Sequence, residues 1–151
     1  MITSATPSDF ETVKNITQTT IREIYPRYYP AGAVEMFCEY HSDESIAGDI
    51  AEGCVYLLKD DGFVGTVTVK GNHISRLFVL PGCQHKGYGR ALLDFAEEKV
   101  LAESDSIELD ASFPAKKIYI KRGYKEISYN IEDTGHGDYL CYDVMRKERS
   151  L

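Results

Sequence analysis

The stretch HISRLFVLPGCQHKGYGRALLDFAEEKVL, residues 73–101, decides the fold of this chain. It begins with a mostly apolar run at residues 74–80, and Pro81 and Gly82 then break the chain. A turn that carries two more glycines leads into an amphipathic segment at residues 91–101. This order predicts a strand, a loop and a helix.

The loop between the predicted strand and helix has the features of an anion site. Gly87 and Gly89 leave the main chain bare where the helix begins, so free N–H groups meet the positive end of the helix dipole. Lys86, Arg90 and His85 add positive charge around the same point. The glycine spacing alone is equally compatible with a plain strand-to-helix turn. The loop has neither the three glycines of a dinucleotide fingerprint nor the Gly-Lys followed by Ser or Thr of a P-loop.

The loop also resembles the signature of one family, the GNAT superfamily of acyl-CoA N-acyltransferases. In that family an apolar strand is followed by Gln or Arg, two residues, Gly, one residue, and then Gly or Ala at the start of a helix. Gln84, Gly87 and Gly89 match this signature position for position. The resemblance therefore rests on the position of the loop between a strand and a helix as well as on its glycines.

A second family motif lies downstream. The family run Asn-x-x-Ala-x-x-x-Tyr-x-x-x-Gly-Phe/Tyr is matched at Ala115, Tyr119, Gly123 and Tyr124. Ser112 stands where the family usually has Asn, so the Asn amide is missing here. With two ordered motifs at family spacing, the resemblance covers nearly the whole chain and is most specific at residues 73–124.

The resemblance implies an acyl-CoA co-substrate, acetyl-CoA in the first instance. Its pantetheine arm would pair with the main chain of the central strand as though it were another strand. Its pyrophosphate would lie on the N–H groups of the glycine loop. The cofactor-binding residues implied in this way are Leu77, Phe78, Val79, Gln84, His85, Lys86, Gly87, Tyr88, Gly89, Arg90, Ser112 and Tyr119.

The remaining segments complete an α+β domain, an α/β sandwich. With 151 residues, the chain fits one domain with a sizeable core. The pattern predicts helices at residues 8–25, 31–40, 42–51, 91–101 and 114–121, the first capped by Ser8 with Glu11. Strands are predicted at residues 1–5, 54–58, 63–69, 74–80, 106–111, 124–131 and 138–145. We expect a mixed, mostly antiparallel sheet of about seven strands with helices on both faces, and a central parallel pair that the resemblance implies is splayed.

The composition of the chain limits the classes of partner that we expect it to bind. The net charge of −7 argues against a general nucleic-acid surface and suits a cationic substrate such as an amine. No stretch is long and apolar enough to span a membrane, and the N-terminus does not read as a signal peptide. Four scattered cysteines indicate free thiols in a reducing, cytoplasmic setting, and no metal site is expected. The sequence does not fix the oligomeric state, and a homodimer is one option.

Acyl transfer to an amine needs a proton for the leaving thiolate. Tyr119 stands where the family's tyrosine hydrogen-bonds the CoA sulfur, and a phenol with a pKa near 10 is protonated at neutral pH. The resemblance therefore implies that Tyr119 is the proton donor. The alternative is an ordinary helix residue that packs on the sheet.

The acceptor amine must also lose a proton before it attacks. His73 begins the central strand, where some family members carry a Glu or His that accepts this proton, and imidazole titrates near neutrality. The alternative is a partly exposed turn residue. Asp110, Glu35 and Tyr142 are further candidates for the base, and His41 and His136 are expected at the surface.

The acceptor site is implied only by position. In the family, the region around residues 22–46 lies over the acceptor, and here it is rich in tyrosine. The predicted substrate-binding residues are Tyr25, Tyr28, Tyr29 and Tyr142, although tyrosines that bridge core and water would give the same pattern.

The favoured interpretation is an N-acetyltransferase that moves an acetyl group from acetyl-CoA to a primary amine, on a small molecule or a peptide, within a ternary complex. An acyl-CoA-binding sensor without turnover is the rival, since it would keep Gln84, Gly87 and Gly89 but need no Tyr119. A phosphate-binding nucleotide enzyme is a third reading of the same loop. The acceptor itself is not fixed by any motif.

Overall fold

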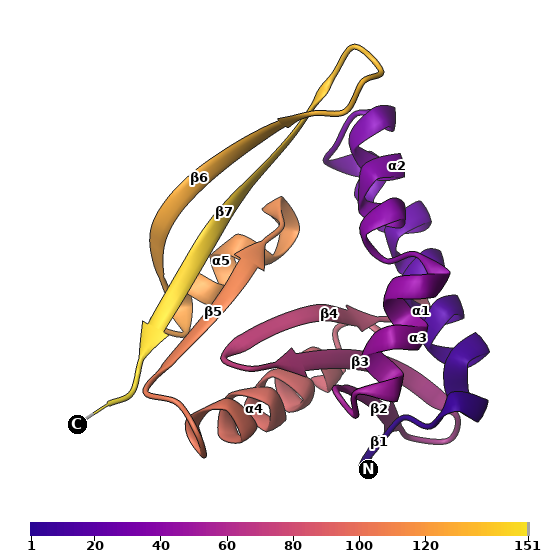
Figure 1. Cartoon of the computed structure of the whole chain (residues 1–151), viewed down its shortest axis with the longest axis vertical. Coiled ribbons are helices and arrows are strands. Elements are labelled where there is room, and N and C mark those ends of the chain that lie inside the picture. Colours follow the sequence, from indigo (N-terminus) through magenta and orange to yellow (C-terminus); the bar gives the residue numbers. More distant parts are fainter. Residues whose placement is uncertain (151) are drawn as a thin grey trace.

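The computed structural model describes residues 1–150 as one seven-stranded sheet with helices on both faces (Figure 1). The strands are β1 (Ile2–Ser4), β2 (Val55–Lys59), β3 (Phe63–Lys70), β4 (His73–Val79), β5 (Ser106–Ala111), β6 (Lys125–Asp133) and β7 (Tyr139–Glu148). The helices are α1 (Phe10–Ile24), α2 (Ala31–Tyr40), α3 (Asp43–Ala51), α4 (Tyr88–Leu101) and α5 (Phe113–Lys121). The predicted fold class is confirmed.

The sheet opens in its middle. Its order is β1-β2-β3-β4-β5-β7-β6, and only the β4–β5 pair is parallel. That pair is short, because His73 faces Glu108, Ile74 faces Leu109, and no further pairing follows. In Figure 1 the two strands diverge like the arms of a V, with α2 reaching the tip of the β6–β7 hairpin. The open end of the V is where the site residues gather.

A bulge in β4 accompanies this divergence. Thr68 pairs with Ser75 but Thr66 pairs with Phe78, so β4 carries one extra residue against β3. Arg76 lies in the bulge with φ 47°, a left-handed conformation that costs a non-glycine residue about 1–3 kcal/mol. An extra residue bends its strand and increases the local twist, so the bulge turns β4 away from β5.

Buried contacts hold Arg76 in this conformation. Its guanidinium lies 3.1 Å from Asp49 Oδ2 and donates to Thr68 Oγ1 at 2.9 Å and to Ser45 Oγ at 3.1 Å. Ser45 and Asp49 belong to α3, so the bulge is anchored to that helix. The bulge has no local signal in the sequence, because nothing in residues 74–80 distinguishes them from a regular strand.

Two apolar clusters cover the two faces of the sheet. The first joins α1, α2 and α3 to β2, β4 and Leu140 of β7, and the second joins α4 and α5 to β3, β5 and Met145 of β7. Helix α4 packs closely on β3, because a Cβ on Gly65 would lie 2.8 Å from Leu92 Cδ1. The clusters fix the helices on each side while the divergent strands leave space between them.

Two details of the N-terminal half refine the prediction. Pro7–Asp9 forms a 3₁₀ turn before α1, and the capping pair is Thr6 with Asp9, whose Oδ2 accepts the Thr6 N–H at 2.8 Å. The predicted pair of Ser8 and Glu11 was wrong. Pro7 occupies the first helical position, so the cap is Thr6, the residue before it. Ser42 caps α3, since its side chain accepts from the Ser45 N–H at 3.2 Å.

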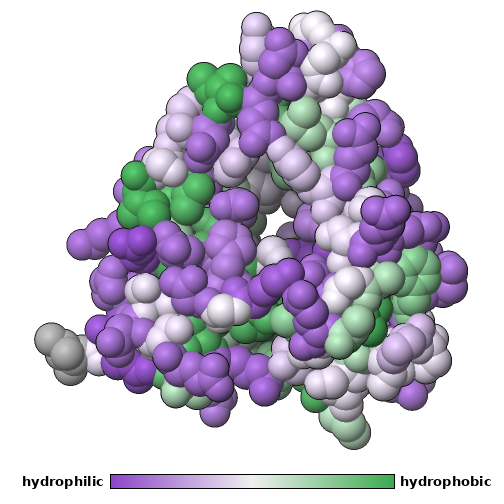
Figure 2. Space-filling model, in the orientation of Figure 1, coloured by the Kyte–Doolittle hydropathy of each residue, from purple (hydrophilic) through white to green (hydrophobic). Residues whose placement is uncertain are grey.

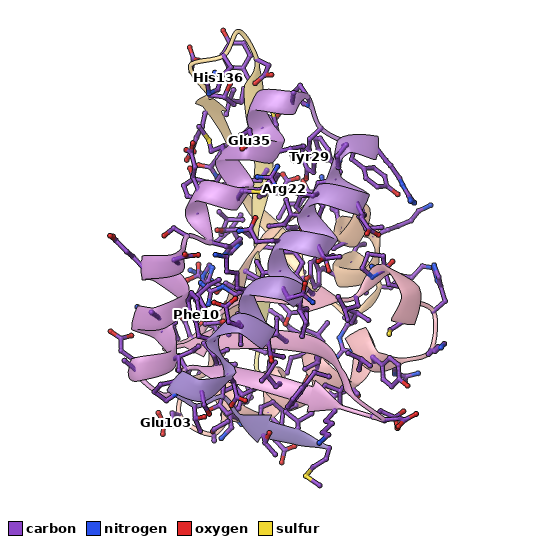
Figure 3. The ribbon with its side chains drawn as sticks, turned by 90° about the vertical axis from the view of Figure 1, so that its right-hand side faces the viewer. Phe10, Arg22, Tyr29, Glu35, Glu103 and His136 are labelled. Atoms are coloured by element: carbon purple, nitrogen blue, oxygen red, sulfur yellow. The ribbon has the colours of Figure 1, made fainter. Side chains whose placement is uncertain are left out.

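Helix α2 is held by contacts to α1 and to the β6–β7 hairpin. On one side Arg22 of α1 meets Glu35 of α2 at 2.9 Å, and Figure 3 shows the pair below His136 at the hairpin tip. On the other side the Gly32 N–H donates to Asp138 Oδ2 at 2.9 Å, and a Cβ on Gly32 would clash with that carboxylate. These contacts hold α2 and the β6–β7 hairpin together across the open end of the sheet.

Several negative findings apply to residues 1–150. None of the described helices is both long and apolar enough to cross a membrane. The four cysteines are all free. No group of three or more His, Cys, Asp or Glu in this part of the chain is placed to hold a metal ion.

Candidate active site

The start of α4 presents a row of free main-chain donors. Within residues 1–150, the N–H groups of residues 84–90 donate to no carbonyl and no side chain. Gly87 precedes the helix with φ 87°, which glycine adopts without strain. Gly89 leaves the surface above the donors uncovered. Free donors at a helix start, with Arg90 beside them, are suited to a phosphate group.

A cleft of about 550 Å³ runs from this loop between β4, α4 and α5. Of the predicted cofactor residues, only Lys86 and Gly87 do not line it. The predicted residues that do are Leu77, Phe78, Val79, Gln84, His85, Tyr88, Gly89, Arg90, Ser112 and Tyr119. The other residues that line it were not predicted to bind the cofactor, although Tyr25 was predicted in the acceptor site and Ala115 belongs to the second motif. They are Thr20, Ile24, Tyr25, Cys83, Leu93, Pro114, Ala115, Ile118, Lys121 and Arg122.

The edge of β4 contributes main-chain groups to this cleft. The Leu80 N–H bonds to Val64 on the β3 side, so alternation along the strand turns the groups of Leu77 and Val79 toward the opening. The Val79 carbonyl accepts Gln84 Nε2 at 3.1 Å. The Gln84 side chain thus fastens the loop to the strand, and the edge between Leu77 and Val79 remains available to an extended ligand.

A second cavity, of about 370 Å³, lies on the other side of the divergent strands. Residues from α2, β4, β5, β6 and β7 line it, including Phe37, Tyr40, Asp110 and Glu132. Figure 2 shows a hollow near the centre of the molecule, rimmed largely by hydrophilic residues. The wall that the two cavities share is formed by Tyr25, Leu77, Phe78, Ser112, Ala115 and Tyr119.

Tyr119 stands out on this shared wall. Its side chain is 7 % exposed, and its ring packs edge-on to Tyr124 with the centroids 5.6 Å apart. No hydrogen bond from its hydroxyl to another residue is found within residues 1–150. Burial raises the pKa of Tyr119 to about 12. The phenol is therefore protonated at neutral pH and free to donate to a bound molecule.

Comparison with known proteins agrees with this geometry. Residues 24–140 match the model of the family described as "Acetyltransferase (GNAT) domain". The chain belongs to the GNAT acetyltransferase family. A search of the curated proteins finds no match for this GNAT chain.

Solved structures share the GNAT fold. A GCN5-related N-acetyltransferase from Rhodopseudomonas palustris is similar with a TM-score of 0.88 and 23 % identity, over 98 % of this chain and 94 % of the other. The PaiA N-acetyltransferase from Thermoplasma acidophilum, solved in complex with coenzyme A, is similar with a TM-score of 0.74 and 20 % identity, over 98 % of both chains. At these identities the likeness concerns the fold.

The candidate bases of this GNAT protein lie in different places. His73 does not line either cavity, but its Nε2 lies 3.8 Å from Oδ2 of Asp110, which does. Burial raises the pKa of Asp110, and the His73 charge opposes that rise. Glu35 lines neither cavity, and its hydrogen bond to Arg22 lowers its pKa. Of the candidate bases, Asp110 and Tyr142 therefore line the 370 Å³ cavity.

The four tyrosines that were predicted to bind the acceptor lie in different places. Tyr25 and Tyr142 line the 370 Å³ cavity. Tyr29 instead accepts the Phe113 N–H at 2.7 Å and stacks on the Phe113 ring, with the centroids 4.9 Å apart. It thereby fixes the start of α5, while Tyr28 is exposed and lines neither cavity.

His41 was expected at the surface, and this expectation was wrong. It ends α2 inside the molecule, lines the 370 Å³ cavity and packs edge-on to Phe78, with the ring centroids 5.6 Å apart. Its Nδ1 is buried without a partner. Burial, together with the charge of Arg76, lowers the pKa of His41 from its usual 6.5 to about 4. The imidazole is therefore neutral in the folded protein at physiological pH.

We predict a loss of stability in mild acid that depends on His41. The unfolded chain takes up the His41 proton near pH 6.5 while the fold resists it until about pH 4, so stability falls across that window as pH drops. Between about pH 7.5 and about pH 5 this single group should cost about 2 kcal/mol. Urea unfolding at the two pH values measures the loss.

The matched variant is His41→Gln, which keeps a polar side chain but cannot titrate. Its loss of unfolding free energy over the same pH range should be smaller than that of the wild type by about 2 kcal/mol. Equal losses in the two proteins would show that His41 is not held neutral by the fold.

The wall residues that sequence reasoning missed come from distant segments. Tyr40 donates a hydrogen bond to Glu132, which lies 92 residues further along the chain. Arg76 reaches the cavity only through the bulge. No periodicity or motif links such residues, because their proximity is created by the packing of α2 on the hairpin.

Proposed function

We propose that this GNAT protein transfers an acetyl group from acetyl-CoA to a primary amine by direct attack in a ternary complex. The observation that carries the proposal is the position of Tyr119 on the wall shared by two cavities. One cavity suits the thioester and the other suits the acceptor. A thioester and an amine held on the two sides of one phenol can react directly, without a covalent enzyme intermediate.

The 550 Å³ cleft fits acetyl-CoA in its chemistry. Free N–H groups at residues 84–90 and the Arg90 side chain suit the pyrophosphate. The open edge of β4 at Leu77 and Val79 suits the amide groups of the pantetheine arm. A β4 N–H near the thioester would also stabilise the oxyanion that forms during attack.

We assign Tyr119 the role of a hydrogen-bond donor to the leaving sulfur. With a pKa of about 12, full proton transfer to a thiolate whose thiol has a pKa of about 8.5 would be uphill by about 5 kcal/mol. A hydrogen bond to the sulfur involves no such transfer, and it strengthens as charge develops there. Solvent supplies the final proton to the released thiolate.

We assign Asp110 as the base, with His73 behind it. The amine nitrogen bonds to the acetyl carbon, the carbon–sulfur bond breaks, and the proton leaves the nitrogen for the Asp110 carboxylate. Burial raises the Asp110 pKa, which makes the carboxylate a better proton acceptor. His73, 3.8 Å away and partly exposed, can then pass the proton toward water.

The proposal is tested by mixing the protein with acetyl-CoA and a panel of primary amines and measuring free thiol. We expect thiol release that depends on the amine and saturates with it. Binding of acetyl-CoA without amine-stimulated release would instead support a CoA-binding sensor. Preferential binding of ATP or NAD would support a nucleotide enzyme.

A further inference from the structure

The 370 Å³ cavity has an excess of negative charge. Its one permanently cationic side chain among residues 1–150, Arg76, is paired with Asp49, and its histidine, His41, is neutral. The carboxylates of Asp110 and Glu132 line the cavity as well. Within residues 1–150 Glu132 forms no ion pair, and Asp110 has only the partly exposed His73 at 3.8 Å. The cavity therefore favours a cation.

Glu132 is oriented without being neutralised. The hydroxyl of Tyr40 donates to Glu132 Oε2, and that of Tyr142 donates to Oε1 at 3.4 Å. Both phenols have raised pKa values, chiefly from burial, so they remain neutral donors. The carboxylate is thus held in a fixed place by two neutral donors. The aromatic rings of Phe37, Tyr40 and Tyr142 line the same cavity, and aromatic rings attract an alkylammonium ion.

Asp110 and Glu132 are spaced for two different groups of one ligand. Asp110 on β5 pairs with Val144 of β7, and Glu132 on β6 pairs with Leu140. Four residues along β7 and two strand spacings separate their Cα atoms by roughly 16 Å, a gap that the side chains shorten. The Glu132 charge still acts on Asp110, since it raises the Asp110 pKa. An aliphatic chain with two nitrogens can reach both carboxylates.

A separate observation marks the cavity as a ligand site. Tyr119, only 7 % exposed, lines the same cavity with a hydroxyl that has no partner within residues 1–150. The end of the cavity near Tyr119 and Ser112 is therefore the reacting end. Glu132 lies beside the C-terminal end of α2, where Tyr40 donates to it.

We propose that the acceptor is an aliphatic diamine or longer polyamine, in which Asp110 meets the nitrogen that is acetylated and Glu132 binds a second nitrogen that stays charged. This inference rests on the proposed function and names its substrate class. Asp110 acts on the reacting atoms. Glu132 is a specificity residue that selects for the second charge, whereas a monoamine of the same length leaves Glu132 without a cation.

The test compares kcat/KM for a series of α,ω-diamines with that for alkyl monoamines and amino alcohols of equal length. A charge-assisted hydrogen bond to Glu132 predicts that the diamines are preferred by about tenfold or more. In Glu132→Gln the preference should fall to near one, because kcat/KM for the diamines falls toward that for the monoamines. Tyr40→Phe, which removes one hydrogen bond but no charge, should keep most of the preference.

The outcomes separate the inference from the function on which it rests. Equal use of diamines and monoamines by the wild type, or a preference that survives Glu132→Gln, would overturn the diamine inference and leave acetyl transfer standing. A peptide amine used in preference to every diamine would do the same. If no amine in the panel stimulated thiol release, both the diamine inference and the proposed acetyl transfer would be overturned. The comparison among substrates in the wild type decides the matter even if Glu132→Gln does not fold.

Discussion

Tyr119→Phe should lower kcat by about a hundredfold and leave the affinity for acetyl-CoA nearly unchanged. The variant keeps the buried ring and its packing on Tyr124 but loses the hydroxyl. That hydroxyl is needed only as negative charge develops on sulfur, and one donor of this kind is worth about 10²–10³ in kcat. Steady-state thiol release and calorimetric binding of acetyl-CoA give the two quantities.

Tyr124→Phe is the matched control. Tyr124 is also a buried tyrosine, but its hydroxyl donates to Glu97 Oε2 at 2.8 Å and it lines neither cavity. Its loss should cost about 1.5–3 kcal/mol of unfolding free energy and leave kcat almost unchanged. If Tyr119→Phe turned over like the wild type, or if both variants lost the same activity, Tyr119 would have no special place in the reaction.

Asp49→Ala should lower the unfolding free energy by about 3–5 kcal/mol. Its carboxylate lies 3.1 Å from the Arg76 guanidinium, whose side chain is only 2 % exposed. Removing it leaves a charge buried in the β4 bulge with hydroxyl partners alone, and the Arg76 Nε already has none. The bulge helps to separate β4 from β5, so the loss should also weaken acetyl-CoA binding. Urea unfolding measures the first effect.

Lys70→Ala tests the same aspartate from its exposed side. Lys70 Nζ lies 3.3 Å from Asp49 Oδ1, but the lysine side chain is 58 % exposed. Exposed pairs are screened by water, so this change should cost less than about 1 kcal/mol. A loss in Asp49→Ala as small as the loss in Lys70→Ala would mean that the buried Arg76 does not depend on its partner.

Local patterns predicted most of the fold. All seven strands and five helices were expected, because apolar periodicity, glycine turns and caps act over a few residues. Gln84, Gly87 and Gly89 marked the loop, and the parallel pair followed from a strand-helix-strand connection. The first helix cap was misplaced because two capping patterns overlap within residues 6–11, and the preference of Pro7 for the first helical position decided between them.

Features made by distant contacts could not be predicted. The positive φ of Arg76 depends on Asp49 and Ser45 of α3, and an arginine in a strand gives no sign of it. The burial of His41 and the place of Glu132 depend on how α2 packs against the β6–β7 hairpin. The 370 Å³ cavity was therefore largely invisible in the sequence, whereas the loop that begins α4 was visible because its glycines form a local pattern.

The most direct test of the central claim is calorimetric titration of acetyl-CoA into the wild type and Gly89→Val. A Cβ at Gly89 would lie 3.8 Å from Val79 Cγ2, an ordinary contact, so the variant should fold. Its side chain would cover the free N–H groups that suit the pyrophosphate. We predict one-to-one binding to the wild type and at least tenfold weaker binding to the variant, with nearly equal thermal midpoints. No binding to the wild type, or equal binding to both, would contradict the account.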